Sequence, residues 1–130
     1  MIELITSLSL WELVKHGTGW IANLSRAGRK RKEESREALR QVIVAARLTR
    51  SYCIHILEKD KRKEEREQEL IRSWTELSFT LQDLGLSLLA GKCDLQGKTW
   101  SDRWTGDRSV LKKIIASLDK TEAAAREMLA

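Results

Sequence analysis

Three stretches of the chain place apolar or small residues at alternating spacings of three and four. The members are Leu39, Val42, Ala46, Thr49, Cys53 and Ile56 in the first stretch, Leu70, Trp74, Leu77, Leu81, Leu84 and Leu88 in the second, and Leu111, Ile114, Leu118, Thr121, Ala125 and Met128 in the third. Because an α-helix has about 3.6 residues per turn, this spacing keeps one side of a helix apolar. The pattern is typical of the buried seams of a helical bundle or coiled coil.

These seams predict an all-α, antiparallel four-helix bundle, with helices at about residues 8–24, 32–57, 62–90 and 107–129. Ser9 and Glu12 form a capping box at the start of the first helix, which we expect to be broken at Gly17–Gly19. Gly91 suits the left-handed position after the third helix, and Asp107 suits the N-cap of the fourth. Residues 91–106 are therefore predicted to be a long connection.

The second and third helices are separated only by a fully charged run at residues 58–65, which contains neither glycine nor proline. The seven-residue register continues through this run, so one continuous helix of about fifty residues is an alternative to two helices. We favour a hairpin at Lys59–Lys61, because a polar stretch on the seam would leave the middle of such a long helix unsupported.

The composition is typical of one compact domain. The 130 residues include seven glycines and no proline, and no window is apolar over the roughly eighteen residues that a membrane span requires. Cys53 and Cys93 form no CxxC or metal-binding spacing, and the first residues lack the basic start and cleavage site of a secretory signal. We therefore expect a single domain over residues 1–130, a cytoplasmic location, and reduced cysteines used as core residues.

The net charge of +5 comes from one part of the chain. Residues 26–50 contain nine lysines or arginines and only three glutamates. Six of these cations lie within about 80° of arc on the second helix at 100° per residue. They are Arg29, Lys32, Arg36, Arg40, Arg47 and Arg50. This stripe predicts either a basic surface that follows a phosphate backbone or a set of ion pairs within the bundle.

The third helix carries a matching stripe of acidic residues, Glu65, Glu69, Glu76 and Asp83. In a hairpin that folds near residue 60, Arg50 is expected to meet Glu69, Arg47 to meet Glu76 or Arg72, and Arg40 to meet Asp83. Each exposed pair would contribute at most about 1 kcal/mol and would chiefly set the register of the two helices. We favour this structural interpretation for Arg36–Arg50.

The basic run at residues 26–32 has no such acidic counterpart. Consecutive cations at the start of a helix oppose the helix dipole, so they destabilise the helix locally and favour an explanation by a binding partner. A solvated corner between two helices is the alternative. The candidate contacts for an anion or a nucleic acid are Arg26, Arg29, Lys30, Arg31, Lys32 and Arg36.

A second candidate surface, for a partner or a ligand, lies in the predicted connection before the fourth helix. Its residues are Trp100, Asp102, Arg103 and Trp104. Two tryptophans four residues apart would share one side of a helical turn. The alternative is that both rings close the end of the bundle as core residues.

No group of residues predicts catalysis or metal binding. Cys53 and His55 would point about 200° apart on a helix and cannot bind one ion together. A metal site formed by His16, His55 or Cys93 across helices is an alternative that we do not favour. We therefore predict that the protein is not an enzyme and has no catalytic residue, cofactor, bound metal or small-molecule substrate.

Two functions of different class fit this sequence. The first is a non-enzymatic interaction module, an oligomeric accessory subunit of a larger assembly, whose partner is another protein or a second copy in a homodimer. Apolar residues outside the three seams favour it, namely Ile43, Val44, Ile54, Ile71, Leu86 and Leu89. The alternative is a small basic subunit that binds the nucleic-acid backbone through Arg26–Lys32. We expect no membrane partner.

Overall fold

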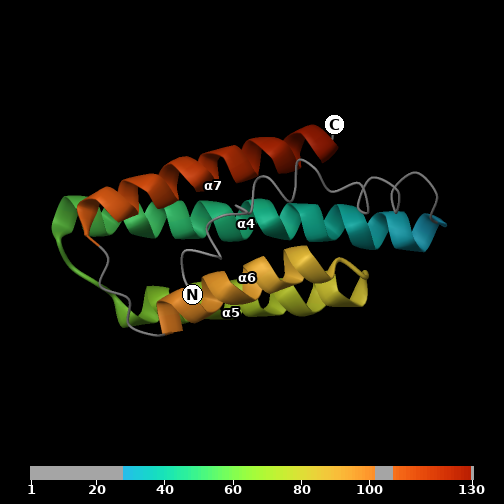
Figure 1. The fold of residues 1–130 in the computed structure, drawn as a ribbon, viewed down its shortest axis with the longest axis horizontal. Coiled ribbons are helices and arrows are strands. Elements are labelled where there is room, and N and C mark those ends of the chain that lie inside the picture. The colour runs from blue at the N-terminus through green and yellow to red at the C-terminus, as the bar shows by residue number, and fades with distance from the viewer. Residues whose placement is uncertain (1–27, 102–106, 130) are drawn as a thin grey trace.

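The computed structural model describes residues 28–101 and 107–129, and within these ranges the chain forms four α-helices and no strand (Figure 1). The helices are α4 (Arg29–Lys59), α5 (Glu64–Asp83), α6 (Ser87–Ser101) and α7 (Arg108–Leu129). The prediction of an all-α helical bundle is confirmed. The first predicted helix, at residues 8–24 with its break at Gly17–Gly19, lies outside the described residues. Among the helices described, none has the length and apolar character needed to cross a bilayer.

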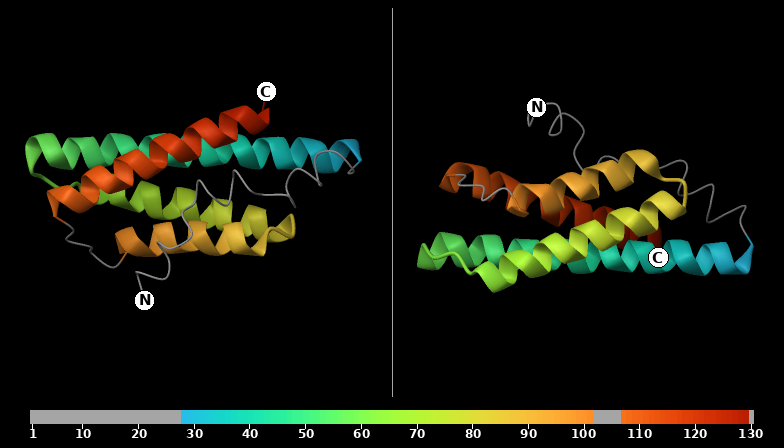
Figure 2. Two further views of the ribbon diagram at one scale, coloured as in Figure 1. Left: turned by 45° about the horizontal axis from the view of Figure 1, so that its top comes forward. Right: turned by 90° about the horizontal axis from the view of Figure 1, so that it is seen from below.

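Helix α4 is the central element, with α7 along one side and the α5–α6 pair along another (Figure 1 and Figure 2). Helices α4 and α7 run in opposite directions. Arg36 of α4 donates a hydrogen bond to the Leu129 carbonyl of α7, whereas Arg47 donates to the Glu122 carboxylate. Residue numbers therefore rise along α4 where they fall along α7.

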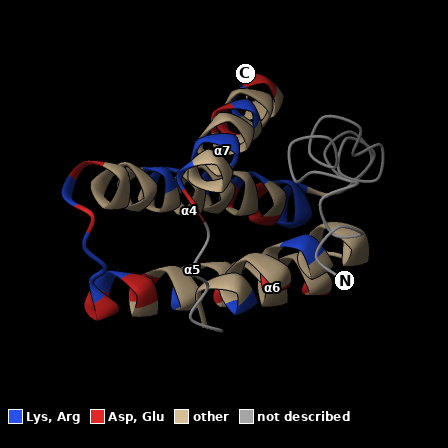
Figure 3. Cartoon of the chain, turned by 60° about the vertical axis from the view of Figure 1, so that its left-hand side comes forward, with Lys and Arg blue, Asp and Glu red and all other residues tan. Residues whose placement is uncertain are grey.

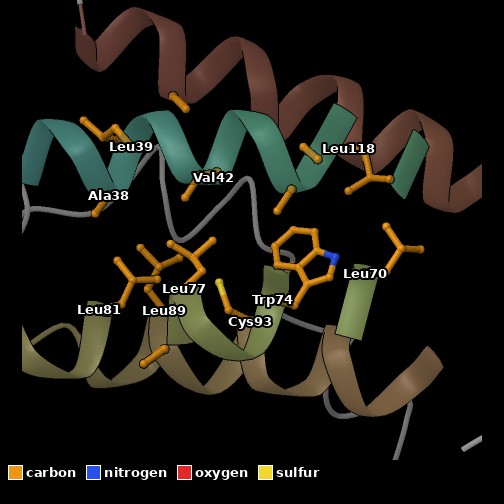
Figure 4. Close-up of a cluster of buried hydrophobic side chains, with 14 of the residues drawn as sticks. Ala38, Leu39, Val42, Leu70, Trp74, Leu77, Leu81, Leu89, Cys93 and Leu118 are labelled. Carbon is orange, nitrogen blue, oxygen red and sulfur yellow. The ribbon is translucent and has the colours of Figure 1, made fainter. Parts of the chain in front are cut away.

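The core lies where α4 packs against the α5–α6 pair on one face and against α7 on another, and it is built from the predicted seams (Figure 4). All predicted seam residues of α4, α5 and α7 are buried or half-buried. Leu88, the last seam residue predicted for the second stretch, lies in α6 instead. It is 73% exposed, because the chain bends before it and starts a new helix. At the centre, the Trp74 indole Nε1–H donates to Thr49 Oγ1 at 2.8 Å, and Thr49 donates to the Ala45 carbonyl at 2.8 Å. These buried polar atoms are thus satisfied.

The chain reverses at residues 60–63, so the predicted hairpin forms and the continuous helix does not. Asp60 adopts the left-handed conformation, with φ of 53°, and its N–H donates to the Ile56 carbonyl. Aspartate tolerates this conformation better than most residues, which is why the turn needs no glycine.

Tyr52 holds the two sides of this reversal together. Its hydroxyl accepts the backbone N–H of Lys63 at 2.8 Å and donates to the Glu67 carboxylate at 2.5 Å. Arg62 Nε donates to the same carboxylate at 2.7 Å. The Tyr52 ring packs edge-on against Trp100, with the ring centroids 5.5 Å apart. One buried side chain of α4 therefore fixes the start of α5 and contacts α6.

The predicted third helix at residues 62–90 is wrong in extent, because two helices occupy this part of the chain. Gly85 has a φ of +80° and ends α5, and the Leu86 N–H donates to the Leu81 carbonyl at 2.9 Å. The Gly85 N–H donates to the Gln82 carbonyl, which completes a Schellman motif. The helix-ending glycine is thus Gly85 and not Gly91.

The predicted connection at residues 91–106 is also wrong, since α6 contains Gly91 and continues to Ser101. Contacts with α5 account for this helix. Ser78 Oγ donates to the Ala90 carbonyl at 2.8 Å. Gly97 lies so close to α5 that an added Cβ would be 3.0 Å from Thr75 Oγ1. The glycine therefore serves close helix packing rather than a loop.

The N-termini of α7 and α4 differ in how they are capped. Asp107 Oδ1 accepts the Val110 N–H at 2.9 Å, so the predicted N-cap of α7 is confirmed. Helix α4 begins at Arg29, three residues before the predicted residue 32, and its N-cap residue Gly28 provides no side-chain hydrogen bond. Four cations therefore occupy its first turn.

Replacing Tyr52 by Phe keeps the ring and removes both hydrogen bonds of the hydroxyl. We expect the free energy of unfolding to fall by about 1–3 kcal/mol, because the Lys63 N–H and the Glu67 carboxylate each lose a partner. Urea denaturation followed by circular dichroism measures this change. Lys61→Ala, an exposed substitution in the same turn, should stay within about 0.5 kcal/mol of the wild type. Equal stability of Tyr52→Phe and the wild type would contradict the role assigned to the hydroxyl.

Two alanine substitutions in α6 should have opposite effects. Nothing lies within 4 Å of a Cβ added at Gly91, so Gly91→Ala should stabilise the helix by about 0.5–1 kcal/mol. Gly97→Ala should be at least about 1 kcal/mol less stable than Gly91→Ala, because the new methyl meets Thr75 and the Ile71 carbonyl. Thermal melts of the two variants test this ranking, and the reverse order would argue against the close packing of α6 on α5.

Candidate functional site

The arginines in the second half of α4 form ion pairs with α7 and not with α5. Arg47 Nη2 lies 2.9 Å from Glu122 Oε2, and Arg50 Nε lies 2.6 Å from Asp119 Oδ1. The predicted pairs of Arg47 with Glu76 and of Arg50 with Glu69 are therefore wrong. The reason is geometric: α7 packs beside the arginine stripe, whereas α5 packs on the neighbouring face of α4.

Glu122 is the most highly connected acidic residue of this interface. It accepts hydrogen bonds from Arg47 and also from Arg126 of its own helix. The bond from Arg47, followed by that from Arg126, lowers the pKa of the Glu122 carboxyl, and the same contact raises the pKa of Arg47. Because both arginines are more than half exposed, solvent screens these pairs, and they set the position of α7 more than they stabilise the fold.

Three other cations of α4, two of them predicted anion contacts, also have partners inside the chain. Arg40 pairs with Glu37 of its own helix at 3.4 Å, so the predicted pair with Asp83 is wrong. Arg36 donates to the Leu129 carbonyl at 3.1 Å, where a cation favours the negative end of α7. Arg31 donates to the Leu84 carbonyl at 2.7 Å and so caps the end of α5. Arg31 is therefore a structural residue.

The remaining cations at the start of α4 are Arg29, Lys30 and Lys32, which we call the basic end. All three are exposed, and none forms an ion pair within the described residues. The first turn of α4 contains no acidic residue that would favour the positive end of the helix dipole. Figure 3 shows these cations in blue where α4 begins. Arg26, the remaining predicted contact, lies outside the described residues.

The acidic residues of α5 that were expected to pair with α4 are exposed instead. They are Glu65, Glu69, Glu76 and Asp83, and none of them forms an ion pair in the part of the chain described here. Two of them, Glu69 and Glu76, line a groove of about 420 Å³ between α4 and α5. Of the charges that the sequence predicted to pair or to bind, the basic end and the groove residues Glu69 and Glu76 are thus left without ion pairs in the described structure.

The second predicted surface lies only partly in the described structure. Trp100 is 2% exposed and packs against Tyr52, so its ring belongs to the core and offers no open contact surface. This placement fits the alternative of an aromatic residue that closes the bundle. Asp102, Arg103 and Trp104 lie outside the described residues.

The two cysteines, which are potentially reactive, are buried core residues. Burial raises the pKa of the Cys53 thiol to about 12 and that of Cys93 well above its usual range, so both stay protonated. They form no disulfide with each other. The described residues contain no group of three His, Cys, Asp or Glu side chains that could hold a metal ion.

The acidic partners of the arginine stripe, Asp119 and Glu122, were missed by the sequence analysis. They lie three residues apart beside the seam residues Leu118 and Thr121, so they form as good an acidic stripe as the one on α5. This signal was available, but the sequence could not decide which of the two acidic helices meets the arginines. Comparison with protein-family models, with curated proteins and with solved structures found no match.

Protonation of His55 should weaken the fold. Its Nε2 atom is buried without a hydrogen-bond partner in the described structure, and its ring stacks on Tyr52. Burial, and then the charges of Lys63, Arg66 and Lys59, lower the pKa of His55. The unfolded chain, with a His pKa of about 6.5, therefore binds a proton at higher pH than the folded chain does. The stability contributed by the neutral ring is complete above about pH 6.5 and is lost as the pH falls through the lower folded pKa.

Urea denaturation between about pH 7.5 and pH 5 measures this loss. We expect His55→Gln to flatten this part of the stability curve, because glutamine does not titrate. Identical slopes for the variant and the wild type would show that His55 is not responsible.

Proposed function

We propose that this protein is a non-enzymatic interaction module whose contact surface is the basic end of α4. The observation that carries the proposal is the exposure of Arg29, Lys30 and Lys32 without ion pairs, in the first turn of a helix. Each cation at this position is disfavoured by about 0.3–1 kcal/mol through the helix dipole. A bound anionic group would offset this repulsion and could also accept the free backbone N–H groups of the turn.

The apolar residues outside the seams support an electrostatic rather than an apolar contact. Leu89 is buried, and Ile43, Ile71 and Leu86 pack against the core. The large apolar side chains that remain exposed in the described helices are spread over all four of them. Scattered residues of this kind are normal on a protein surface. A role as an oligomeric accessory subunit would therefore depend on charge.

A nucleic-acid backbone is the second candidate partner. It is favoured by the same three cations, which are exposed side by side at one end of the molecule. If each cation neutralises one phosphate, log affinity should fall with log salt concentration with a slope of about −2.7 for duplex and about −2.1 for single-stranded nucleic acid. If the natural partner is instead an acidic protein surface, the basic end should bind an acidic polypeptide more tightly than it binds nucleic acid.

Binding of two labelled probes, measured by fluorescence anisotropy between about 50 and 200 mM salt, tests the proposal. The probes are a random-sequence nucleic acid, single-stranded and duplex, and poly-glutamate. We expect micromolar binding of at least one probe at low salt. The variant Arg29→Glu, Lys30→Glu, Lys32→Glu should lose this binding at least tenfold while its melting temperature stays unchanged or rises slightly, because glutamate favours a helix start.

The matched control is Lys98→Glu, Lys112→Glu, Lys113→Glu, which changes the net charge equally at exposed positions of α6 and α7. It should lose far less affinity than the basic-end variant. Equal losses in the two variants, or no binding of either probe by the wild type, would overturn the proposal. Preference for one probe separates the two candidate partners.

A further inference from the structure

The groove between α4 and α5 is lined mostly by polar side chains and carries a negative charge. Its charged residues are three carboxylates, Glu37, Glu69 and Glu76, and one guanidinium, Arg72. We propose that this acidic groove receives the basic end of a second copy of the chain, in a closed two-fold dimer. The inference rests on the proposed function, because it names the acidic protein surface that the basic end binds.

The carboxylates of the groove are available to a partner. Within the described structure, Glu69 and Glu76 form neither an ion pair nor a side-chain hydrogen bond. Glu37 makes only exposed contacts to Arg40 and Gln41 of its own helix. Carboxylates gathered along one groove repel each other, and cations brought by a partner would relieve this repulsion.

The basic end does not pair with the groove of its own molecule. Within the described residues, none of its three cations forms an ion pair with a groove carboxylate. The two surfaces therefore carry opposite charge, and neither is neutralised by the other within one molecule.

A two-fold axis satisfies both surfaces at once. If the α4 helices of two copies pass each other in opposite directions, the offset from basic end to groove is the same for each copy. Both contacts then form together, as in any isologous interface, and each raises the effective concentration of the other. In such a dimer both basic ends and both acidic grooves are occupied, so a third copy cannot bind through the same contact.

A nucleic acid would be repelled by the carboxylates of the groove. Charge complementarity thus favours a second copy of the chain as the occupant.

Charge exchange between two variants tests this inference. Sedimentation equilibrium at low salt should give a mass of twice 15.0 kDa for the wild type, with weaker association as salt rises. The basic-end variant Arg29→Glu, Lys30→Glu, Lys32→Glu and the groove variant Glu69→Lys, Glu76→Lys should each be monomeric. An equimolar mixture of the two should form dimers again, because acidic ends then meet basic grooves.

The control is Asp94→Lys, Glu127→Lys, which changes exposed acidic residues of α6 and α7 by the same charge and should dimerise like the wild type. Circular dichroism melts establish that every variant is folded. Restored association in the mixture cannot be explained by misfolding of either variant, so it supports the proposed contact.

Three outcomes would overturn the inference. The wild type could remain monomeric at high concentration and low salt. Dimers could persist in both variants, which would place the interface elsewhere, or the mixture of variants could remain monomeric. None of these outcomes bears on the binding of the basic end to poly-glutamate or nucleic acid, so failure of the dimer is distinguishable from failure of the proposed function.

Discussion

The reversal of the chain at residues 60–63 is the constraint on which the rest of the described structure depends. The charged run that contains it would be compatible with a straight helix, since it lacks glycine and proline. The hairpin is selected because Tyr52 is buried in α4 and its hydroxyl has two partners only when α5 turns back. Burying that hydroxyl without partners would be costly, so the tertiary structure and the turn specify each other.

Once the chain has turned, α4 presents two neighbouring faces to different helices. The α5–α6 pair covers one face, where Trp74 bonds to Thr49, and α7 covers the other. The position of α7 determines the charge pattern of the surface. Because Asp119 and Glu122 neutralise Arg50 and Arg47, the acidic stripe of α5 is left without arginine partners. The basic end of α4 is exposed because no described ion pair includes it. The separation of charge that suggests a binding function is thus a result of packing.

The candidate site illustrates how far local reasoning extends. The first turn of α4 was identified from the sequence because four consecutive cations oppose the helix dipole whatever surrounds them. Sequence alone could not separate Arg31 from its neighbours, since its role depends on the Leu84 carbonyl, 53 residues away. The groove could not be predicted either, because the expected arginine partners would have covered its carboxylates. Contacts between distant residues decide which of many similar charges remain exposed.

The sequence by itself determined the helical class, the buried seams, the hairpin preference and the cap at Asp107, because each depends on residues within one or two turns of each other. Only the tertiary structure decided that residues 91–101 continue as a helix. The apolar periodicity of α6 is weak. The helix is held on α5 by the close approach of Gly97 to Thr75 and by the hydrogen bond from Ser78 of α5 to the Ala90 carbonyl. The tertiary structure likewise decided which acidic helix meets the arginines, since ion pairs of equal local quality are chosen by how the apolar seams pack.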